Sequence, residues 1–341
     1  MKKDVINIYD IAEMAKVSIA TVSRVVNGSD KVSEKTRKKV MAVIEEVGYT
    51  PNVFAQGLGL NTMHTVGILV PSISDLYMSN AVYYLQERLR GYGYDCILSC
   101  SGFEPEGKKR HVNMLLSKHV DGLILVGSTY AGNGEHVQDT DYIREAAEHV
   151  PVFVINGNVQ GENVYCTVND DVRAMYDVTS KLIESGRERI VFLTDSLSYS
   201  AIKKRKGYEQ ALEDHGIPLR PELEMHVVNQ MHAVRDQLRE CRTPFDAVVA
   251  ANDEIAIGAL KYAVMKGLRV PEDLSVVGYN NCNIALACEP ELTSIDNHVE
   301  KGCTLTVDRL IAVIENKGDA PEHKVVIPCK VVVRATTDFK E

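Results

Sequence analysis

The stretch IYDIAEMAKVSIATVSRVVNGSDKVSEKTRKKVMAVIEEVGYTPNVFAQGL, residues 8–58, decides how this chain folds at its N-terminal end. Asn7 is placed to cap a first helix, with Asp10 at the third helical position, and Ser18 is placed to cap a second helix. Apolar residues recur at helical spacing in both segments, so the two helices are expected to pack face to face across a short turn. This pattern predicts a helix-turn-helix.

A third helix is predicted over residues 34–47, where Ser33 can act as the N-cap and Gly48 marks the end. Its apolar stripe closes the small core that the first two helices begin. The basic face of this helix is either part of a nucleic-acid contact or an ordinary solvated face, and it consists of Lys35, Arg37, Lys38 and Lys39.

The distribution of charge separates the two ends of the chain. The formal net charge of the 341 residues is −9, yet residues 1–60 carry nine Lys and Arg against seven Asp and Glu. The remaining residues carry 29 basic against 40 acidic side chains. Because an acidic body repels phosphates, we expect any nucleic-acid contact to lie in the N-terminal segment.

The overall composition is that of a soluble globular protein, with 45% hydrophobic and 25% charged residues. No apolar run approaches the roughly 20 residues that a membrane span needs, and MKKDVINIYD lacks the apolar stretch of a signal peptide. We therefore expect a cytoplasmic protein without a membrane partner. The eight cysteines are scattered without zinc-site spacings, so they are interpreted as structural thiols, and neither a metal nor a cofactor is expected.

Residues 8–58 resemble the DNA-binding segment of the lactose-repressor/galactose-repressor (LacI/GalR) family of bacterial transcription regulators over its whole length of about 50 residues. The resemblance implies that the second helix lies in the major groove of double-stranded DNA. The residues that would face the groove are Ile19, Ala20, Thr21, Ser23 and Arg24. Those that would meet phosphates or position the domain are Tyr9, Ser18, Asn27, Ser33 and Thr36.

The chemistry of these side chains agrees with that role. The guanidinium of Arg24 can pair with a guanine edge, whereas Ile19 and Ala20 offer only van der Waals contacts such as those to a thymine methyl group. For Thr21 and Ser23 an alternative stays open, namely helix packing and local backbone hydrogen bonding.

A weak helix is predicted after the third helix, because Asn52 can cap it while Gly57 and Gly59 each cost it about 1 kcal/mol relative to alanine. In the resembled family this segment is the hinge helix, which pairs with its dimer mate in the minor groove and wedges a leucine between base pairs. The residues expected to contact DNA here are Asn52, Ala55 and Leu58. An ordinary linker contact is the alternative for Leu58.

Beyond the hinge, apolar runs alternate with amphipathic stretches in two successive halves, a pattern typical of parallel sheets with helices on both faces. The last strand is expected around VVIPCKVVV. The resemblance implies a periplasmic-binding-protein-like pair of doubly wound lobes joined by three crossovers. The expected domains are a helix-turn-helix at 1–51, a hinge helix and linker at 52–64, and an effector-binding and dimerisation core at 65–341, with an N-lobe of about 65–168 and 297–331 and a C-lobe of about 169–296.

Ligands of doubly wound sheets bind beyond the carboxyl ends of the strands, so the polar residues that follow each apolar run are candidates. They are Ser72, Ser74, Ser128, Asn156, Asp195, Ser196, Asn252, Asp253, Asn280 and Asn281. Small hydrogen-bonding side chains suit a sugar or another polyol. The loops are polar in any case, and Asp253 also fits the cap of the next helix, while Glu254 is interpreted as part of a solvated helix start.

Asn156 and Asn280 stand where sugar-binding members of the family commonly carry aspartate, and arginine is common where this chain has Ile202 or Lys204, of which Ile202 cannot bind an anion. Losing two carboxylates beside a lysine makes the pocket less hostile to an anion. This departure predicts a modified or acidic saccharide as the small-molecule effector. The alternative is that residues 203–206 form only the solvated face of a helix.

Two other functional classes compete with a transcription regulator. An enzyme is disfavoured because no strand is followed by G-x-G-x-x-G, G-x-x-x-x-G-K-[ST] or G-x-S-x-G, and a pure solute-binding module because the chain carries a DNA-binding segment. We therefore predict a ligand-responsive repressor of carbohydrate-utilisation genes that binds a palindromic operator as a homodimer. The absence of leucine heptads after the last strand predicts no tetramer.

Overall fold

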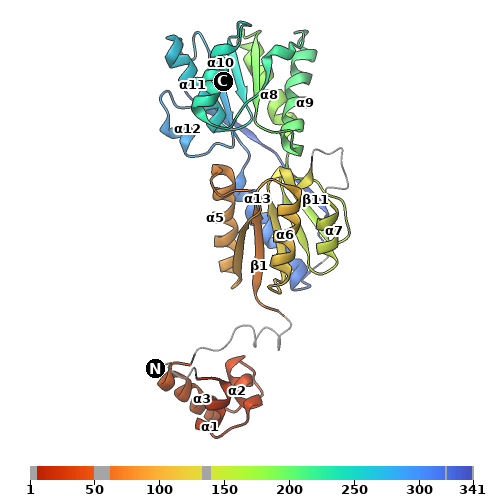
Figure 1. Cartoon of the computed structure of the whole chain (residues 1–341), viewed down its shortest axis with the longest axis vertical. Coiled ribbons are helices and arrows are strands. Elements are labelled where there is room, and N and C mark those ends of the chain that lie inside the picture. Colours follow the sequence, from red (N-terminus) through yellow and green to blue (C-terminus); the bar gives the residue numbers. More distant parts are fainter. Residues whose placement is uncertain (1–5, 50–61, 133–139, 319–320, 340–341) are drawn as a thin grey trace. The chain divides into compact units, whose positions relative to one another are not determined.

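The computed structural model describes residues 6–49, 62–132, 140–318 and 321–339. The chain divides into two compact units, Met1–Thr65 and Val66–Glu341, which are described separately. Figure 1 shows a small helical unit and a larger unit built of sheets and helices.

The first unit contains the three predicted helices, α1 (Ile8–Met14), α2 (Ile19–Val26) and α3 (Glu34–Val47). Asn7 caps α1 as predicted and forms a capping box with Asp10, because Asn7 Oδ1 accepts from Asp10 N at 3.4 Å while Asn7 N donates to Asp10 Oδ2 at 2.8 Å. Ser18 and Ser33 cap the next two helices, and Gly48 ends the third with a φ of 64°. Their buried apolar side chains form one core, made of Ile11, Ala12, Ala15, Val22, Val25, Val40 and Ile44.

The second unit consists of two doubly wound lobes, each built on a six-stranded sheet. The N-lobe sheet has the order β11-β5-β4-β3-β1-β2, with β1 (Thr65–Val70), β2 (Asp95–Cys100), β3 (Gly122–Val126), β4 (Val152–Ile155), β5 (Val164–Asn169) and β11 (Lys324–Ile327). The C-lobe sheet has the order β12-β10-β9-β8-β6-β7, with β6 (Ile190–Thr194), β7 (Glu224–His226), β8 (Ala247–Ala250), β9 (Ser275–Tyr279), β10 (Thr293–Asp296) and β12 (Lys330–Val332).

Helices cover both faces of each sheet (Figure 1). The N-lobe carries α5 (Leu76–Gly91), α6 (Pro105–Leu116), η1 (Ser128–Ala131), α7 (Asp141–Ala147) and α13 (Val299–Ile314). The C-lobe carries α8 (Asp171–Glu184), α9 (Tyr199–Asp214), η3 (Pro221–Leu223), α10 (Met231–Glu240), α11 (Asp253–Lys266) and α12 (Ile284–Ala287). Because both faces are covered, neighbouring strand residues such as Ile68 and Leu69 are both fully buried, which explains the continuous apolar runs of the sequence.

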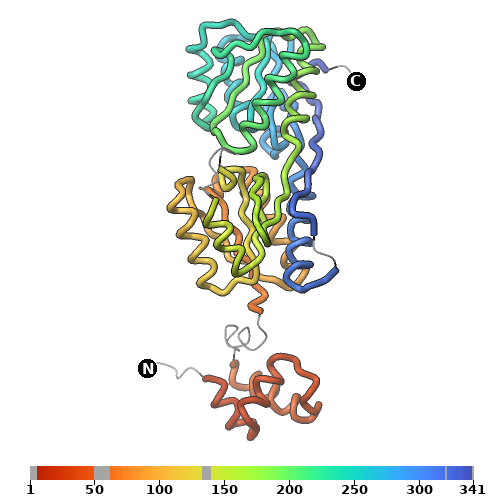
Figure 2. Tube along the Cα trace, turned by 90° about the vertical axis from the view of Figure 1, so that its right-hand side faces the viewer, coloured from red at the N-terminus to blue at the C-terminus, as the bar shows by residue number. Residues whose placement is uncertain are grey.

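The described chain passes between the lobes after β5, after β10 and after β11 (Figure 2). The last passage corrects the prediction of one strand around VVIPCKVVV. The segment forms two strands in different sheets, since Pro328 has no N–H to donate to a ladder and interrupts the run. As a result β12 pairs antiparallel with β10 in the C-lobe, and the N-lobe part ends before the predicted residue 331.

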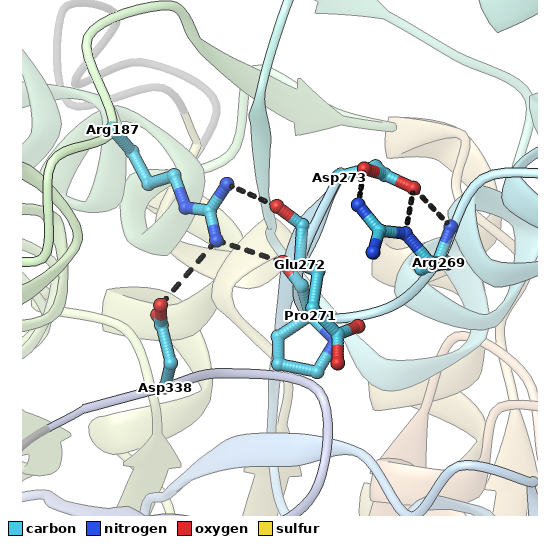
Figure 3. A network of polar contacts seen from close by, with 6 residues as sticks. All are labelled: Arg187, Arg269, Pro271, Glu272, Asp273 and Asp338. Atoms are coloured by element: carbon cyan, nitrogen blue, oxygen red, sulfur yellow. Dashed lines mark hydrogen bonds and ion pairs between the residues drawn. The ribbon is translucent and has the colours of Figure 1, made fainter.

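The C-terminal segment after β12 is fastened to the C-lobe by polar contacts (Figure 3). The Arg187 guanidinium donates to Pro271 O at 2.7 Å and to Glu272 O at 3.1 Å, and it lies 3.5 Å from the Asp338 carboxylate. Thr336 Oγ1 donates to Val276 O on β9 at 2.6 Å.

No helix in the described part of the chain has the length and apolar character of a membrane span.

Candidate functional site

The first candidate surface is the outer face of α2. Val22 and Val25 are buried, which turns Ile19, Ala20 and Arg24 to the surface, and Ile19 is 42% exposed. Thr21 and Ser23, also expected to face the groove, are half-buried on this helix. The helix therefore presents an arginine and two small or apolar side chains from one face, an arrangement that fits reading of base edges in a major groove.

The residues expected to meet phosphates lie at helix ends around α2. Tyr9 is 66% exposed, and Ser18 and Ser33 are exposed, while Asn27 and Thr36 are half-buried. Ser18 Oγ lies 2.9 Å from Thr21 Oγ1, and Ser33 Oγ lies 2.9 Å from Thr36 Oγ1. The Thr21 hydroxyl thus contacts another side chain of its own unit, the N-cap Ser18. Asn52, Ala55 and Leu58 lie outside the described residues.

One residue of the basic face of α3 has a structural contact. The Arg37 guanidinium donates to Ser29 O at 2.7 Å and so fastens the turn between α2 and α3. Lys35, Lys38 and Lys39 are exposed. These ammonium groups give α3 a positively charged surface.

The second candidate site is a cavity of about 310 Å³ between the lobes, lined by both of them. Most of the side chains predicted from the strand ends line it, namely Ser72, Ser74, Ser128, Asn156, Asp195, Ser196, Asn252 and Asn280, and so does Lys204 of α9. Asn156 and Asn280 have φ angles of 64° and 94°, which turn the chain at the ends of β4 and β9. The Asn156 side chain is 8% exposed, and its Oδ1 has no hydrogen-bond partner in the described structure.

Asp253 and Asn281 do not line this cavity. Asn252, rather than Asp253, caps α11, with Oδ1 accepting from Ile255 N at 2.8 Å. The Asp253 carboxylate turns inward and accepts from Ser294 Oγ at 2.6 Å and from Cys282 N at 2.7 Å. The interpretation of Asp253 as a cap and as a cavity residue is corrected, because the first position of α11 directs its side chain toward β10.

Lys204 is 6% exposed and lies at the wall of the cavity. Its ammonium donates to Ala251 O at 2.8 Å and lies 3.5 Å from the centroid of the Tyr279 ring. Burial lowers the pKa of Lys204, and the carboxylates of Asp171 and Asp195 oppose that shift. The residue is therefore part of a built cavity wall and not of a solvated helix face.

The cavity also contains carboxylates that sequence reasoning missed or assigned elsewhere. Asp75 caps α5, and Glu254, which was interpreted as part of a solvated helix start, lines the cavity with it. Burial raises the pKa of Glu254, and the nearby Asp75 raises it further. Burial likewise raises the pKa of Asp195, with Lys204 acting in the opposite direction. The carboxylates offer hydrogen-bond acceptors for hydroxyl or amino groups.

Two further residues that line the cavity could have been predicted from the sequence, because they follow strands. Phe103 follows β2 and Asn229 follows β7, so the rule of strand ends applied to these strands identifies them as well. Ser198 and Ser200, by contrast, begin α9, and Ser198 Oγ accepts from Ser128 Oγ of the other lobe at 2.9 Å. No pattern in the sequence predicts that contact between Ser128 and Ser198.

A helix-turn-helix unit joined to a two-lobed core with a polar cavity defines the class of ligand-responsive DNA-binding regulators. Comparison with known families agrees: the family described as bacterial regulatory proteins, lacI family, matches residues 7–52, and the periplasmic binding protein-like domain matches residues 179–337. The chain is 46% identical over 336 residues to an HTH-type transcriptional regulator of Lachnoclostridium phytofermentans, covering 98% of this chain and 100% of that one. The chain belongs to the LacI family of DNA-binding transcription regulators.

Other relatives extend along the whole chain. Catabolite control protein A of Priestia megaterium is 33% identical over 339 residues, covering 97% of this chain and 99% of its own. Among solved structures, the Lac repressor dimer bound to operator and the anti-inducer ONPF is 28% identical, with a TM-score of 0.85 over 97% of this chain and 98% of that chain. A complex of the regulator CelR with cellobiose is 27% identical, with a TM-score of 0.70 over 97% of this chain and 100% of that chain.

Proposed function

We propose that this regulator is a homodimeric repressor that binds an inverted-repeat operator, and that a saccharide in the cavity between the lobes controls its affinity for DNA. The observation that carries the proposal is the pairing of an exposed recognition face on α2 with a cavity lined by hydroxyl, amide and carboxylate groups. The proposed place of action is the cytoplasm, and no catalytic role is assigned to the cavity.

The relatives support both halves of this proposal. One solved relative is a repressor dimer on its operator, and another holds cellobiose. In a symmetric dimer two recognition helices read two half-sites, so an inverted repeat is the expected target. Hydroxyl groups of a sugar can pair with the Asn156 amide and with the carboxylates of Asp75 and Glu254.

DNA binding is tested by footprinting DNA from the region around the gene of this protein. We expect protection of an inverted repeat and an affinity that falls steeply with salt, because phosphate contacts release counterions. Arg24→Ala should weaken specific binding by about ten- to a hundredfold, the range for loss of a bidentate base contact. The matched control is Arg239→Ala, an exposed arginine of α10, which should leave binding unchanged. Protection of a non-palindromic site by a monomer contradicts the proposal.

Effector binding is tested by thermal shift with glucose, cellobiose, galacturonate and glucose 6-phosphate. A ligand at a hundred times its Kd stabilises the folded protein by about 2.7 kcal/mol. Stabilisation by the acidic sugars alone would identify Lys204 as an anion partner, as its sequence position suggests. Stabilisation by the neutral sugars alone would show that the carboxylates of Asp75, Asp195 and Glu254 determine selectivity. If a broad saccharide panel gives no shift, the assignment of the cavity to a sugar is wrong.

A further inference from the structure

Two adjacent residues at the end of β9, Tyr279 and Asn280, connect the cavity to the segments that join the lobes. We call these the lobe-crossing segments: residues 169–171 between β5 and α8, residues 297–298 between β10 and α13, and residues 328–329 between β11 and β12. Any change in the angle between the lobes must change the backbone of these segments, since the described chain joins the lobes there.

Tyr279 contacts the first and the last lobe-crossing segment. Its side chain is fully buried, and its hydroxyl donates to Asp171 Oδ1 at 2.5 Å. The Cys329 sulfur lies 3.5 Å from the same hydroxyl oxygen. Burial raises the pKa of Cys329 to about 11, so the protonated thiol can donate to the phenol oxygen whose own proton is directed at Asp171.

The same tyrosine contacts Lys204, a residue of the cavity wall. The Lys204 ammonium lies 3.5 Å from the centroid of the Tyr279 ring, and Ser200 Oγ donates to Asp171 Oδ2 at 2.6 Å. Lys204 and Ser200 both line the cavity. A ligand that attracts this ammonium competes with its cation–π contact to the ring and thereby acts on the hydrogen bonds of the Tyr279 hydroxyl.

Asn280 contacts the remaining lobe-crossing segment. Its Oδ1 accepts from Asn297 Nδ2 at 2.9 Å, and Asn297 O in turn accepts from Asn169 Nδ2 at 2.7 Å. Asn280 lines the cavity in a left-handed backbone conformation, with a φ of 94°. Through these bonds the end of β9 reaches all of the lobe-crossing segments.

We propose that Tyr279 and Asn280 are positioning residues that transmit occupation of the cavity to the lobe-crossing segments. This inference rests on the proposed function, because it takes the cavity as the effector site. The contacts are continuous, and Lys204, Tyr279 and Asp171 are buried while Cys329 is half-buried. A shift of Lys204 changes the position of the Tyr279 ring, and the Tyr279 hydroxyl contacts both Asp171 and Cys329. Both lobes can then respond to one ligand without a separate signal to each crossing.

A double-mutant cycle read by hydrogen exchange tests the connection without any ligand. Lys204→Met perturbs the cavity wall, and exchange is followed in the full chain at the amides of residues 326, 327, 329–332 and 296–299. In the protein with Tyr279 unchanged, we expect Lys204→Met to speed exchange at these amides about tenfold. In the Tyr279→Phe variant, the same substitution should speed exchange less than twofold. Equal factors in the two backgrounds would overturn the proposal.

Two further variants keep the outcome interpretable. Ser200→Ala is a milder change of the cavity wall and replaces Lys204→Met in the cycle if that variant does not fold. Tyr208→Phe is the matched control, because Tyr208 is a 1% exposed tyrosine of the same lobe whose hydroxyl donates to Ile190 O at 2.8 Å, away from the crossings. The control should leave the tenfold response intact. Since neither sugar nor DNA enters the cycle, its failure leaves the proposed function standing, and failure of the sugar panel leaves the cycle readable.

Discussion

Asp253 carries a buried carboxylate that forms no ion pair within the described part of the chain. It is 2% exposed, and burial raises its pKa to about 6, although hydrogen bonds from Ser294 and from the Cys282 amide act in the opposite direction. The folded state thus binds this proton more tightly than the unfolded chain does. The contribution of Asp253 to stability is present below about pH 4 and is lost as the pH rises through 6.

This sign gives a prediction for urea unfolding between pH 4 and pH 7. The unfolding free energy of the unchanged protein should fall between pH 4 and pH 7, whereas residue 253 does not titrate in Asp253→Asn. We expect the fall to be larger in the unchanged protein than in the variant, by on the order of 2 kcal/mol. At low pH the variant should be close to the unchanged protein in stability, because the amide, like the protonated carboxyl, can accept from Cys282 N and donate to Ser294 Oγ. The two unfolding free energies are compared pH by pH, and parallel curves would show that Asp253 does not titrate in this range.

At the scale of elements, the packing of α8 against α9 depends on a glycine, Gly207 of α9. A Cβ at Gly207 would lie 2.2 Å from Val172 O and 3.0 Å from Met175 Cβ, so the two helices can approach only because no side chain stands there. We expect Gly207→Ala to lower the unfolding free energy by about 2 kcal/mol, although alanine is the better helix former.

The control for this packing is a second helical glycine. At Gly302 in α13 the nearest neighbour of a new Cβ is Thr167 Cγ2 at 3.9 Å, an ordinary contact. Gly302→Ala should therefore keep or raise the stability, by up to about 1 kcal/mol. Thermal unfolding of the two variants side by side decides the matter, and an equal loss in both would mean that close helix contact is not the cause.

At the scale of the whole molecule, an exposed apolar surface on α11 and α12 is the expected place of contact between two copies. Val264 is 77% exposed and Leu286 is 54% exposed, beside an apolar groove lined by Met231, Ile257, Leu260, Val264, Ile284 and Ala287. Large exposed apolar surfaces mark interfaces, and the proposed operator requires two copies of the chain.

Val264→Glu should place a charge in that contact and shift the mass seen by light scattering from about twice 37.8 kDa toward the value of the single chain. Operator affinity should fall with it, since a single recognition helix reads only one half-site. Leu219→Glu is the control, because Leu219 is a 47% exposed leucine outside the groove. A variant that stays dimeric would place the interface elsewhere, and a stable native tetramer would contradict the predicted assembly.

Local features of the sequence were sufficient for the first unit and for the order of elements in the second. Asn7, Ser18, Ser33 and Gly48 act within a few residues of themselves, so their capping roles follow from the neighbouring sequence alone. The strand-end rule also located Asn156 and Asn280, because the carboxyl ends of parallel strands meet at one edge of a sheet.

The sequence by itself therefore determined the helix-turn-helix, the doubly wound class and much of the cavity, since each depends on periodicity or on immediate neighbours. Only the tertiary structure decided that Pro328 divides one apolar run between two sheets and that Asp253 turns inward. It also decided that Tyr279 meets Asp171, 108 positions away in the chain. Contacts of this kind depend on which strands become neighbours, and that order is set by the packing of the whole lobe and not by any local pattern.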